Sequence, residues 1–344
     1  MISHRPKLLV SMVLLACVHV VILFAGFFAP YDFALQNREE PNAPPARLHF
    51  FAADGRFHLR PFVYGVTQPA PGSVEYRENR SVSYPIHFLV QGGAYKIAGL
   101  IPSHLHLFGV SSPGALFLLG SDAFGRDQFS RFLYGGQISL LAGSLAALLS
   151  LSLGAILGAL SGYYGGWLDD ALMRFGELFL ALPWLYLLFA IRAALPLHIT
   201  EWQVFMLLVA VLGLIGWARP ARLIRGVILS ARERKFVAAA RGFGASDTYL
   251  LTRHVLPQAY PVVLTQFALL IPQYVLAEVT LTFLGLGVSE PIPSWGSLLS
   301  PLQHYSVLSS CWWMFLPALL LVPIFLAYYA TADTLQERLK SASL

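Results

Sequence analysis

The sequence has little charge and almost no cysteine. Of its 344 residues, 12% are charged and 56% are hydrophobic, whereas a soluble globular domain carries about 25% charged residues. This imbalance excludes an ordinary soluble domain and favours a protein that crosses a membrane several times. The only two cysteines, Cys17 and Cys311, lie in apolar surroundings, so neither a disulfide framework nor a cysteine metal cluster is indicated.

Lysine is also scarce, and its positions exclude one kind of chemistry. The four lysines are Lys7, Lys96, Lys235 and Lys340, and none follows a glycine. A phosphate-binding loop needs a Gly-Lys pair, so we expect no ATPase activity in this chain. The Gly-x-Ser-x-Gly and His-Glu-x-x-His motifs of hydrolases are absent as well. We therefore expect no catalytic residue, no cofactor and no bound metal.

The net charge of +5 raises the question of a nucleic-acid partner. The basic residues gather in loops beside apolar runs, however, and not on one stripe with interleaved aromatic residues. Cytoplasmic loops of membrane proteins are rich in Lys and Arg, and this rule explains the distribution better. We expect a lipid bilayer as the environment and no nucleic acid.

Six apolar runs indicate transmembrane helices, each of which needs about 20 residues. The runs are 8–28, 138–160, 175–195, 202–218, 262–284 and 312–332. Six spans put both termini on the same side of the membrane, which we take to be the cytoplasm, and a short charged tail, 333–340, follows the sixth. In the fifth run Pro272 is expected to break the helix. Because a charged acid at mid-membrane costs about 3 kcal/mol, Glu278 has two open roles, one in the pore and one as a structural hydrogen-bonding group.

The long segment between the first two runs differs in character. Residues 30–136 contain proline, glycine, charges of both signs and short alternating runs, which predicts an insert with β-strands outside the cytoplasm. Asp54-Gly55 between two β-prone runs predicts a hairpin, and Ser83–Val90 a further strand. His104 and His106 alternate without a third ligand nearby, so we interpret them as surface residues rather than metal ligands.

Two patterns around the second run predict packing. Phe129, Phe132 and Leu133 can lie on one face of a short interfacial helix, with Arg126 and Asp127 facing water. The run itself then carries a small residue at every fourth position, which lets another helix approach closely. The stripe consists of Ala142, Ala146, Ser150, Gly154, Gly158, Gly162 and Gly166.

One polar stretch, residues 236–257, lies between two apolar runs, and we call it the elbow. Gly244 is expected to end its first helix with a left-handed residue, Ser246 or Asp247 to cap its second helix, and Pro257 to stop that helix. Eight Lys or Arg and only two acids occur between Arg219 and Arg253, which predicts a cytoplasmic loop.

The first half of the elbow has an apolar helical face. Phe236, Ala239, Ala240 and Phe243 recur at helical spacing, so this face should pack against a neighbouring element while Arg241 points to water.

The elbow resembles the EAA loop of the membrane subunits of ABC importers, which consists of a Glu-Ala-Ala triplet, a glycine and a distal Leu-Pro pair. Here the glycine is Gly244 and the pair is Leu256-Pro257, but the triplet reads Ala238-Ala239-Ala240, without the glutamate. In that family the loop is a coupling helix that sits in a groove of the ATPase subunit. The resemblance implies a coupling role for Ala238, Ala239, Ala240, Gly244, Ala245, Ser246, Asp247, Leu256 and Pro257.

Two further segments resemble the dipeptide and oligopeptide branch of these permeases. In 119–137 the matching residues are Gly120, Asp122, Gly125, Arg126, Asp127, Ser130, Arg131, Tyr134 and Gly135. In 278–298 they are Phe283-Leu284-Gly285-Leu286-Gly287 and Pro293-Ser294-Trp295-Gly296. The resemblance implies an all-α polytopic membrane protein with the six transmembrane helices of the type I ABC importer permease fold and a small β-containing extracytoplasmic insert.

The expected organisation has four parts. Residues 1–29 form the N-terminus and first span, 30–136 the insert and interfacial helix, 137–335 a five-helix core with the cytoplasmic loop 218–257, and 336–344 a tail. The resemblance implies import of peptides across a bacterial inner membrane, together with two ABC ATPase subunits, a sister permease in a heterodimer and an extracytoplasmic substrate-binding protein. Import of another solute such as a metal chelate, an ion-coupled secondary transporter, and a membrane sensor or anchor are the alternatives.

Overall fold

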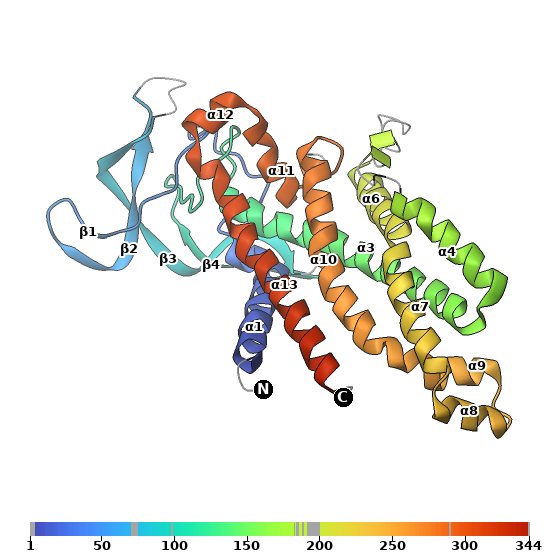
Figure 1. Cartoon of the computed structure of the whole chain (residues 1–344). Helices are drawn as coiled ribbons and strands as arrows, with labels where there is room; N and C mark the ends of the chain where they lie inside the picture. Colours follow the sequence, from blue (N-terminus) through green and yellow to red (C-terminus); the bar gives the residue numbers. More distant parts are fainter. Residues whose placement is uncertain are drawn as a thin grey trace. The chain divides into compact units, whose positions relative to one another are not determined.

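A computed structural model describes residues 4–69, 75–97, 99–181, 183, 186–187, 189–190, 200–288 and 290–342. The chain divides into two compact units, and each is described here by itself (Figure 1). The first unit combines Met1–Leu14, Leu140–Glu278 and Phe325–Leu344, and the second combines Leu15–Ser139 and Val279–Ile324.

Four helical segments in the described part of the chain are long and apolar enough to cross a membrane. They are Gln128–Tyr164, Glu201–Arg232, Asp247–Phe283 and Trp312–Glu337. The first predicted run is a shorter apolar helix, α1 (His4–Leu23), followed after Phe24 by α2 (Ala25–Phe28). Part of the third predicted run, 175–195, lies outside the described residues, as do residues 196–199 of the loop that follows. The described helix α4 spans Gly166–Ala181.

In the first unit, the small-residue stripe of α3 (Gln128–Tyr164) contacts α7 (Ala218–Arg232). A Cβ atom on Gly158 would lie 2.4 Å from the backbone oxygen of Ala221, and one on Gly162 would lie 2.9 Å from that of Arg225. No side chain fits at such distances, so glycine lets the two backbones touch. The predicted packing face is confirmed over this part of α3.

Three further helices contribute to the first unit. α6 (Glu201–Gly216) precedes α7 and begins with a capping box, in which Thr200 Oγ1 accepts from the backbone of Gln203. α10 (Tyr260–Phe283) contacts α3 through Tyr274, whose hydroxyl donates to Ser150 Oγ at 2.8 Å. α13 (Leu316–Ala342) contributes its C-terminal part.

Two predicted helix interruptions are wrong, and the predicted charged tail is helical. Pro272 does not break the fifth run, because α10 continues through it. Residues 128–136 do not form a separate interfacial helix, because α3 begins at Gln128 and continues to Tyr164. The charged segment 333–340 continues the helical backbone of α13. Local breaker residues and polarity suggest boundaries, but packing along a long helix overrides them.

The second unit contains an antiparallel sheet in the order β1-β2-β3-β4. The strands are β1 (His49–Phe51), β2 (Phe57–Thr67), β3 (Arg77–Ile97) and β4 (Ile101–Val110). Gly55 has a φ of 83° in the turn between β1 and β2, which confirms the predicted hairpin. The predicted strand Ser83–Val90 is the middle of β3.

The sheet has a small apolar core formed by Val63, Ile86 and Leu116. His106 in β4 is buried, with 2% of its surface exposed, and is not the surface residue that the sequence suggested. Its Nδ1 lies 2.7 Å from the carbonyl oxygen of Ala29, and its Nε2 lies 3.0 Å from that of Gly93. His104, two residues earlier in the same strand, is exposed.

Short helices complete the second unit. They are α11 (Trp295–Leu299), a 3₁₀ turn (Ser300–Gln303), α12 (Tyr305–Ser310) and a second 3₁₀ turn (Trp312–Phe315). Trp295 is fully buried, and its indole N–H donates to the backbone oxygen of Phe132 at 3.1 Å. Ser294 begins α11 with a capping box.

Candidate functional site

The elbow follows α7 as a helix, a turn and a second helix (Figure 1). α8 (Lys235–Gly242) ends in a turn in which Gly244 has a φ of 84°. The Gly244 N–H donates to the oxygen of Arg241, and the Ala245 N–H donates to that of Ala240. This pair of bonds is the Schellman motif, which satisfies the last carbonyls of a helix and needs a left-handed residue. The predicted glycine turn is confirmed.

Ser246 and Asp247 were both candidates for the cap of the second helix, and they have different partners. Ser246 Oγ accepts from the Tyr249 backbone N–H at 3.4 Å and caps α9 (Asp247–Tyr249). The Asp247 carboxylate instead accepts from the hydroxyl of Tyr163 at 2.7 Å. Serine therefore holds the local turn, and aspartate ties the elbow to the end of α3.

The second helix of the elbow changes its winding twice. A π-helix (Leu250–Val255) follows α9, and a 3₁₀ segment (Leu256–Ala259) leads into α10. Pro257 does not stop the helical path, contrary to the prediction, because it occupies an early position of the 3₁₀ segment, where a missing backbone N–H is tolerated. Single π turns are rare and occur often at functional sites.

The apolar face predicted on α8 is largely exposed in the described part of the chain. Val237 is fully buried, whereas Phe236 is 41% and Phe243 is 92% exposed. The Phe236 ring lies 6.2 Å from the ring of His254, centroid to centroid. Which neighbour covers Phe243 stays a prediction. An aromatic ring that is nine-tenths exposed beside a basic segment is a surface that another molecule can cover.

The predicted coupling residues divide by exposure. Ala238, Ala239, Gly244, Ser246 and Asp247 are exposed, whereas Ala240, Ala245, Leu256 and Pro257 are half-buried. Leu250 and Val255, which lie between these residues in the sequence, are fully buried.

Polar side chains hold the elbow and α7 against the end of α3. Arg232 donates to the backbone oxygens of Gly162 and Tyr163 at 3.0 and 3.1 Å. A cation at a helix C-terminus satisfies the free carbonyls and the helix dipole together. Arg241 donates to the Tyr163 hydroxyl at 3.4 Å. Sequence reasoning missed these bonds because the partners are about 70 or more residues apart and no spacing rule joins them.

A second ion pair braces α4 against α7. Arg225 Nε and Nη2 both lie 2.5 Å from the carboxylate of Asp169, which also accepts from Ser161 Oγ. The hydrogen bond from Arg225, with help from Ser161, lowers the pKa of Asp169 below its ordinary value.

The second unit contains a further charged cluster. Arg126 Nη1 lies 2.6 Å from Glu290 Oε2, and Arg131 Nη2 lies 2.7 Å from Glu290 Oε1. Arg126 also donates to Asp122 at 2.7 Å. Arg126 and Asp127 were predicted to face water, but their residues are only 7% and 2% exposed. Arg126 can be buried because it pairs with Asp122 and Glu290, and buried charges are tolerated where they meet opposite charges.

Two acids of the sequence analysis occupy buried positions. Asp127 accepts from the Ser130 hydroxyl at 2.6 Å and from its backbone N–H at 2.8 Å, and burial raises the pKa of this carboxyl to about 6. Glu278 is fully buried in α10. Among the described residues, no group of three or more His, Cys, Asp or Glu side chains is placed to hold a metal ion.

Long apolar helices together with a basic, partly exposed elbow define a polytopic helical membrane protein built to contact another protein. Residues 154–341 match the family model described as binding-protein-dependent transport system inner membrane component, and the chain belongs to this family. It is a permease subunit of a binding-protein-dependent ABC importer.

Similar proteins come from peptide transport systems. The dipeptide transport system permease protein DppC of Bacillus subtilis is 32% identical over 228 residues, which cover 66% of this chain and 69% of that protein. The oligopeptide transport system permease protein OppC of Mycobacterium bovis is 36% identical over 231 residues, covering 67% of this chain and 78% of that protein. A crystal structure of an amino acid ABC transporter with histidines aligns with a TM-score of 0.43 at 17% identity, covering 62% of this chain and 92% of that chain.

Proposed function

We propose that this chain forms half of the translocation path of a peptide importer in a bacterial inner membrane. The peptide substrate is supported by the names of the related permeases in Bacillus subtilis and Mycobacterium bovis. In this proposal six helices of the type I fold span the membrane, both termini lie in the cytoplasm, and the sheet-containing insert lies outside. A sister permease forms the other half of the path, and a substrate-binding protein delivers the peptide.

The elbow is proposed to couple the permease to two ATPase subunits. The observation that carries this proposal is the exposure of Phe243, 92%, at the end of α8 next to the rigid turn at Gly244. An apolar ring so exposed stabilises a docked partner when it enters a pocket. The basic residues around it favour an acidic rim on the ATPase. Alanine at position 238 removes the carboxylate of the usual triplet and leaves this apolar contact to bind the partner.

Work done by the ATPases must then reach the membrane helices. The bonds of Tyr163 with Asp247 and Arg241 connect the elbow to the end of α3, and the bonds from Arg232 connect α7 to the same end. A displacement of the elbow is therefore passed to a helix of the core. We propose that this chain contributes no enzymatic step. Glu278, buried in α10, is the residue that we propose lines the path or fixes the helices around it.

Replacing Phe243 with serine tests the proposal in the complete transporter, reconstituted in liposomes. We expect the ATPases to co-purify at least tenfold less and ATP-dependent peptide uptake to be lost, because burial of a phenylalanine contributes about 1.5–3 kcal/mol. Leu59→Ser is the matched control, since Leu59 is 86% exposed on β2.

Two results would contradict the proposal. Full retention of the ATPases and normal uptake by the Phe243→Ser variant would exclude the elbow as the contact. Uptake that persists without the ATPases but collapses with the ion gradient would identify a secondary transporter instead.

A further inference from the structure

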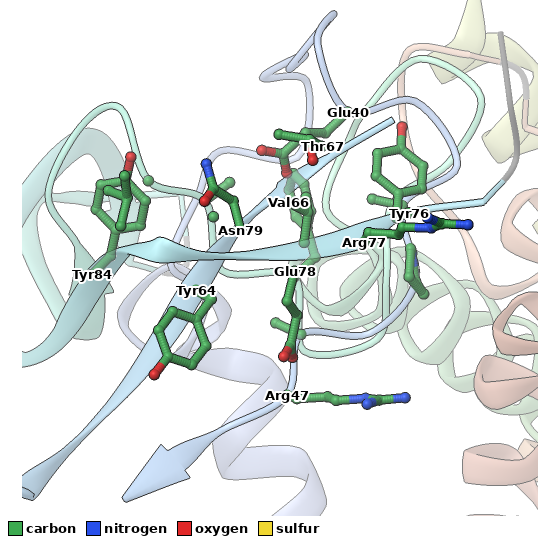
Figure 2. A pocket seen from close by; sticks show the side chains of 18 of the residues that line it. Glu40, Arg47, Tyr64, Val66, Thr67, Tyr76, Arg77, Glu78, Asn79 and Tyr84 are labelled. Carbon is green, nitrogen blue, oxygen red and sulfur yellow. The ribbon is translucent and has the colours of Figure 1, made fainter. Parts of the chain in front are cut away.

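The insert contains a cavity of about 610 Å³ beside the end of β2 (Figure 2). This volume lies within the 300–1,000 Å³ typical of small-molecule sites. The walls include the segment 43–47, residues 64–67 of β2, Tyr76, and residues 77–80 of β3. Tyr64, Tyr76 and Tyr84 contribute aromatic surface, and charged side chains of both signs stand around them.

The backbone of β2 is open on the side of this cavity. β1 pairs with β2 only at His49↔Phe62 and Phe51↔Phe57, whereas β3 pairs with β2 as far as Thr67. Residues 65–67 therefore have a paired strand on one side only, within the described residues. An unpaired strand edge is a template for another extended chain.

The segment 43–47, on the other side of the cavity, does not pair with the free edge of β2. Ala46 donates its backbone N–H to Phe117 at 2.8 Å, and the Ala43 backbone N–H donates to Ser121 Oγ at the same distance. The segment 43–47 is thus hydrogen-bonded away from β2. The space between it and residues 65–67 is the cavity.

Opposite charges mark the two ends of this wall. The antiparallel order of His49 with Phe62 places Arg47 toward Tyr64 and Glu40 toward Thr67, and Figure 2 shows Glu40 beside Thr67, well away from Arg47. Neither the Glu40 carboxylate nor the Arg47 guanidinium has a hydrogen bond or an ion pair in the described part of the chain. The Glu78 carboxylate between them is paired with His49 at 3.0 Å.

The burial of the Glu40 carboxyl group favours binding of a cationic group of the ligand next to it. Burial, with a smaller contribution from the neighbouring charge of Glu39, raises the pKa of Glu40 to about 7. A half-buried carboxylate without a counter-charge is stabilised when a cation binds next to it.

We propose that this cavity binds a short peptide in extended conformation, added as a strand to residues 65–67, with its α-ammonium group at Glu40 and its α-carboxylate at Arg47. Main-chain bonds to a strand edge give affinity for any sequence, and the charges at both ends select free termini. The peptide class rests on the import function proposed above. The permease would then hold substrate on its own insert, separately from the membrane path.

The test measures binding of tri-L-alanine to the purified full-length chain in lipid nanodiscs by calorimetry. We expect saturable binding to the wild type and at least tenfold weaker binding of N-acetyl-tri-alanine and of tri-alanine amide. Glu40→Gln should weaken binding of tri-alanine by about tenfold or more, as expected for a bond to a charged group, and leave binding of the acetylated peptide unchanged. Arg47→Gln should likewise weaken binding of tri-alanine by about tenfold or more and leave binding of tri-alanine amide unchanged.

Asp54→Asn and Arg56→Gln are the matched controls, because this exposed pair lies in the β1–β2 turn. Thermal unfolding checks that each variant is folded. Absence of saturable binding, or equal binding by Glu40→Gln, Arg47→Gln and the controls, would overturn the proposal.

The outcome is separable from that of the import proposal. If the complete transporter imports tri-alanine but the permease alone does not bind it, the cavity proposal fails and peptide import stands. If the permease binds tri-alanine with the expected pattern but the transporter imports no peptide, peptide import fails and the cavity remains a peptide site.

Discussion

The hydroxyl of Tyr163 at the end of α3 donates to the carboxylate of Asp247 in the elbow at 2.7 Å. This bond joins the last turn of a long apolar helix to the first residue of α9. Tyr163 is 7% exposed, so its hydroxyl has few alternatives in water.

Tyr163→Phe removes this bond and leaves the ring. We expect the elbow to open more often, by a factor of about five, because a single hydrogen bond contributes about 1 kcal/mol. Amide hydrogen exchange across 235–249 measures this opening. The neighbouring Tyr164→Phe is the control, since Tyr164 is 53% exposed; equal exchange in both variants would contradict the assigned role.

Asp169→Asn should destabilise the fold by about 2 kcal/mol near neutral pH, because it breaks a bond between charged groups. Since the folded pKa of Asp169 is lowered, its stabilisation is present above the ordinary pKa of about 4 and is lost as pH falls through the folded value. The gap in thermal stability between wild type and variant should therefore close in acid. Asp170→Asn, at an exposed position, should show no such gap, and a gap independent of pH would exclude the ion pair as the cause.

Gly158→Ala tests the close approach of α3 and α7. The added methyl group would meet the Ala221 oxygen at 2.4 Å, so we expect a loss of about 1–3 kcal/mol in the free energy of unfolding. Gly226→Ala in α7 meets no atom within 4 Å and should be neutral or stabilise by about 0.5–1 kcal/mol. Denaturant titration in detergent compares the two; similar effects would mean that the helices do not touch there.

Glu290→Ala leaves Arg126 and Arg131 with one acid fewer. Their side chains are 9% and 2% exposed, while that of Glu290 is 47% exposed. We expect a loss of about 1–3 kcal/mol, below the value for a fully buried pair because water reaches the carboxylate. Thermal unfolding measures it, with Glu233→Ala as control, whose carboxylate is 76% exposed. A loss no larger than that of the control would show that the cluster contributes little.

The features predictable from the sequence are those set by neighbouring residues. The Gly244 turn, the Ser246 cap and the Asp54-Gly55 hairpin depend on local backbone geometry, and each was found. The apolar face of the elbow was predicted to point at a neighbour, but periodicity separates apolar from polar sides without saying which molecule covers the apolar one. The described part of this chain leaves Phe243 exposed.

Pairings between distant residues could not be predicted. The burial of Arg126 depends on Glu290, which is 164 residues away, and that of His106 on the carbonyl of Ala29. A single sequence shows which residues are charged or polar, but it does not show which of them meet when they are far apart in the chain. The same limit applies to Pro257 and Pro272. Each was predicted to interrupt a helix, but the effect of a proline in a packed helix depends on contacts with residues distant in the sequence.

The π-helix of Leu250–Val255 lies in the second half of the elbow, ahead of α10, and is wound more loosely than an α-helix. An α-helix advances about 100° per residue, so a π turn that relaxes by one residue would rotate everything before it about the helix axis by that amount. A displacement of Phe243 by a bound partner would then rotate the N-terminus of α10 about its helix axis. No separate hinge would be needed for this rotation.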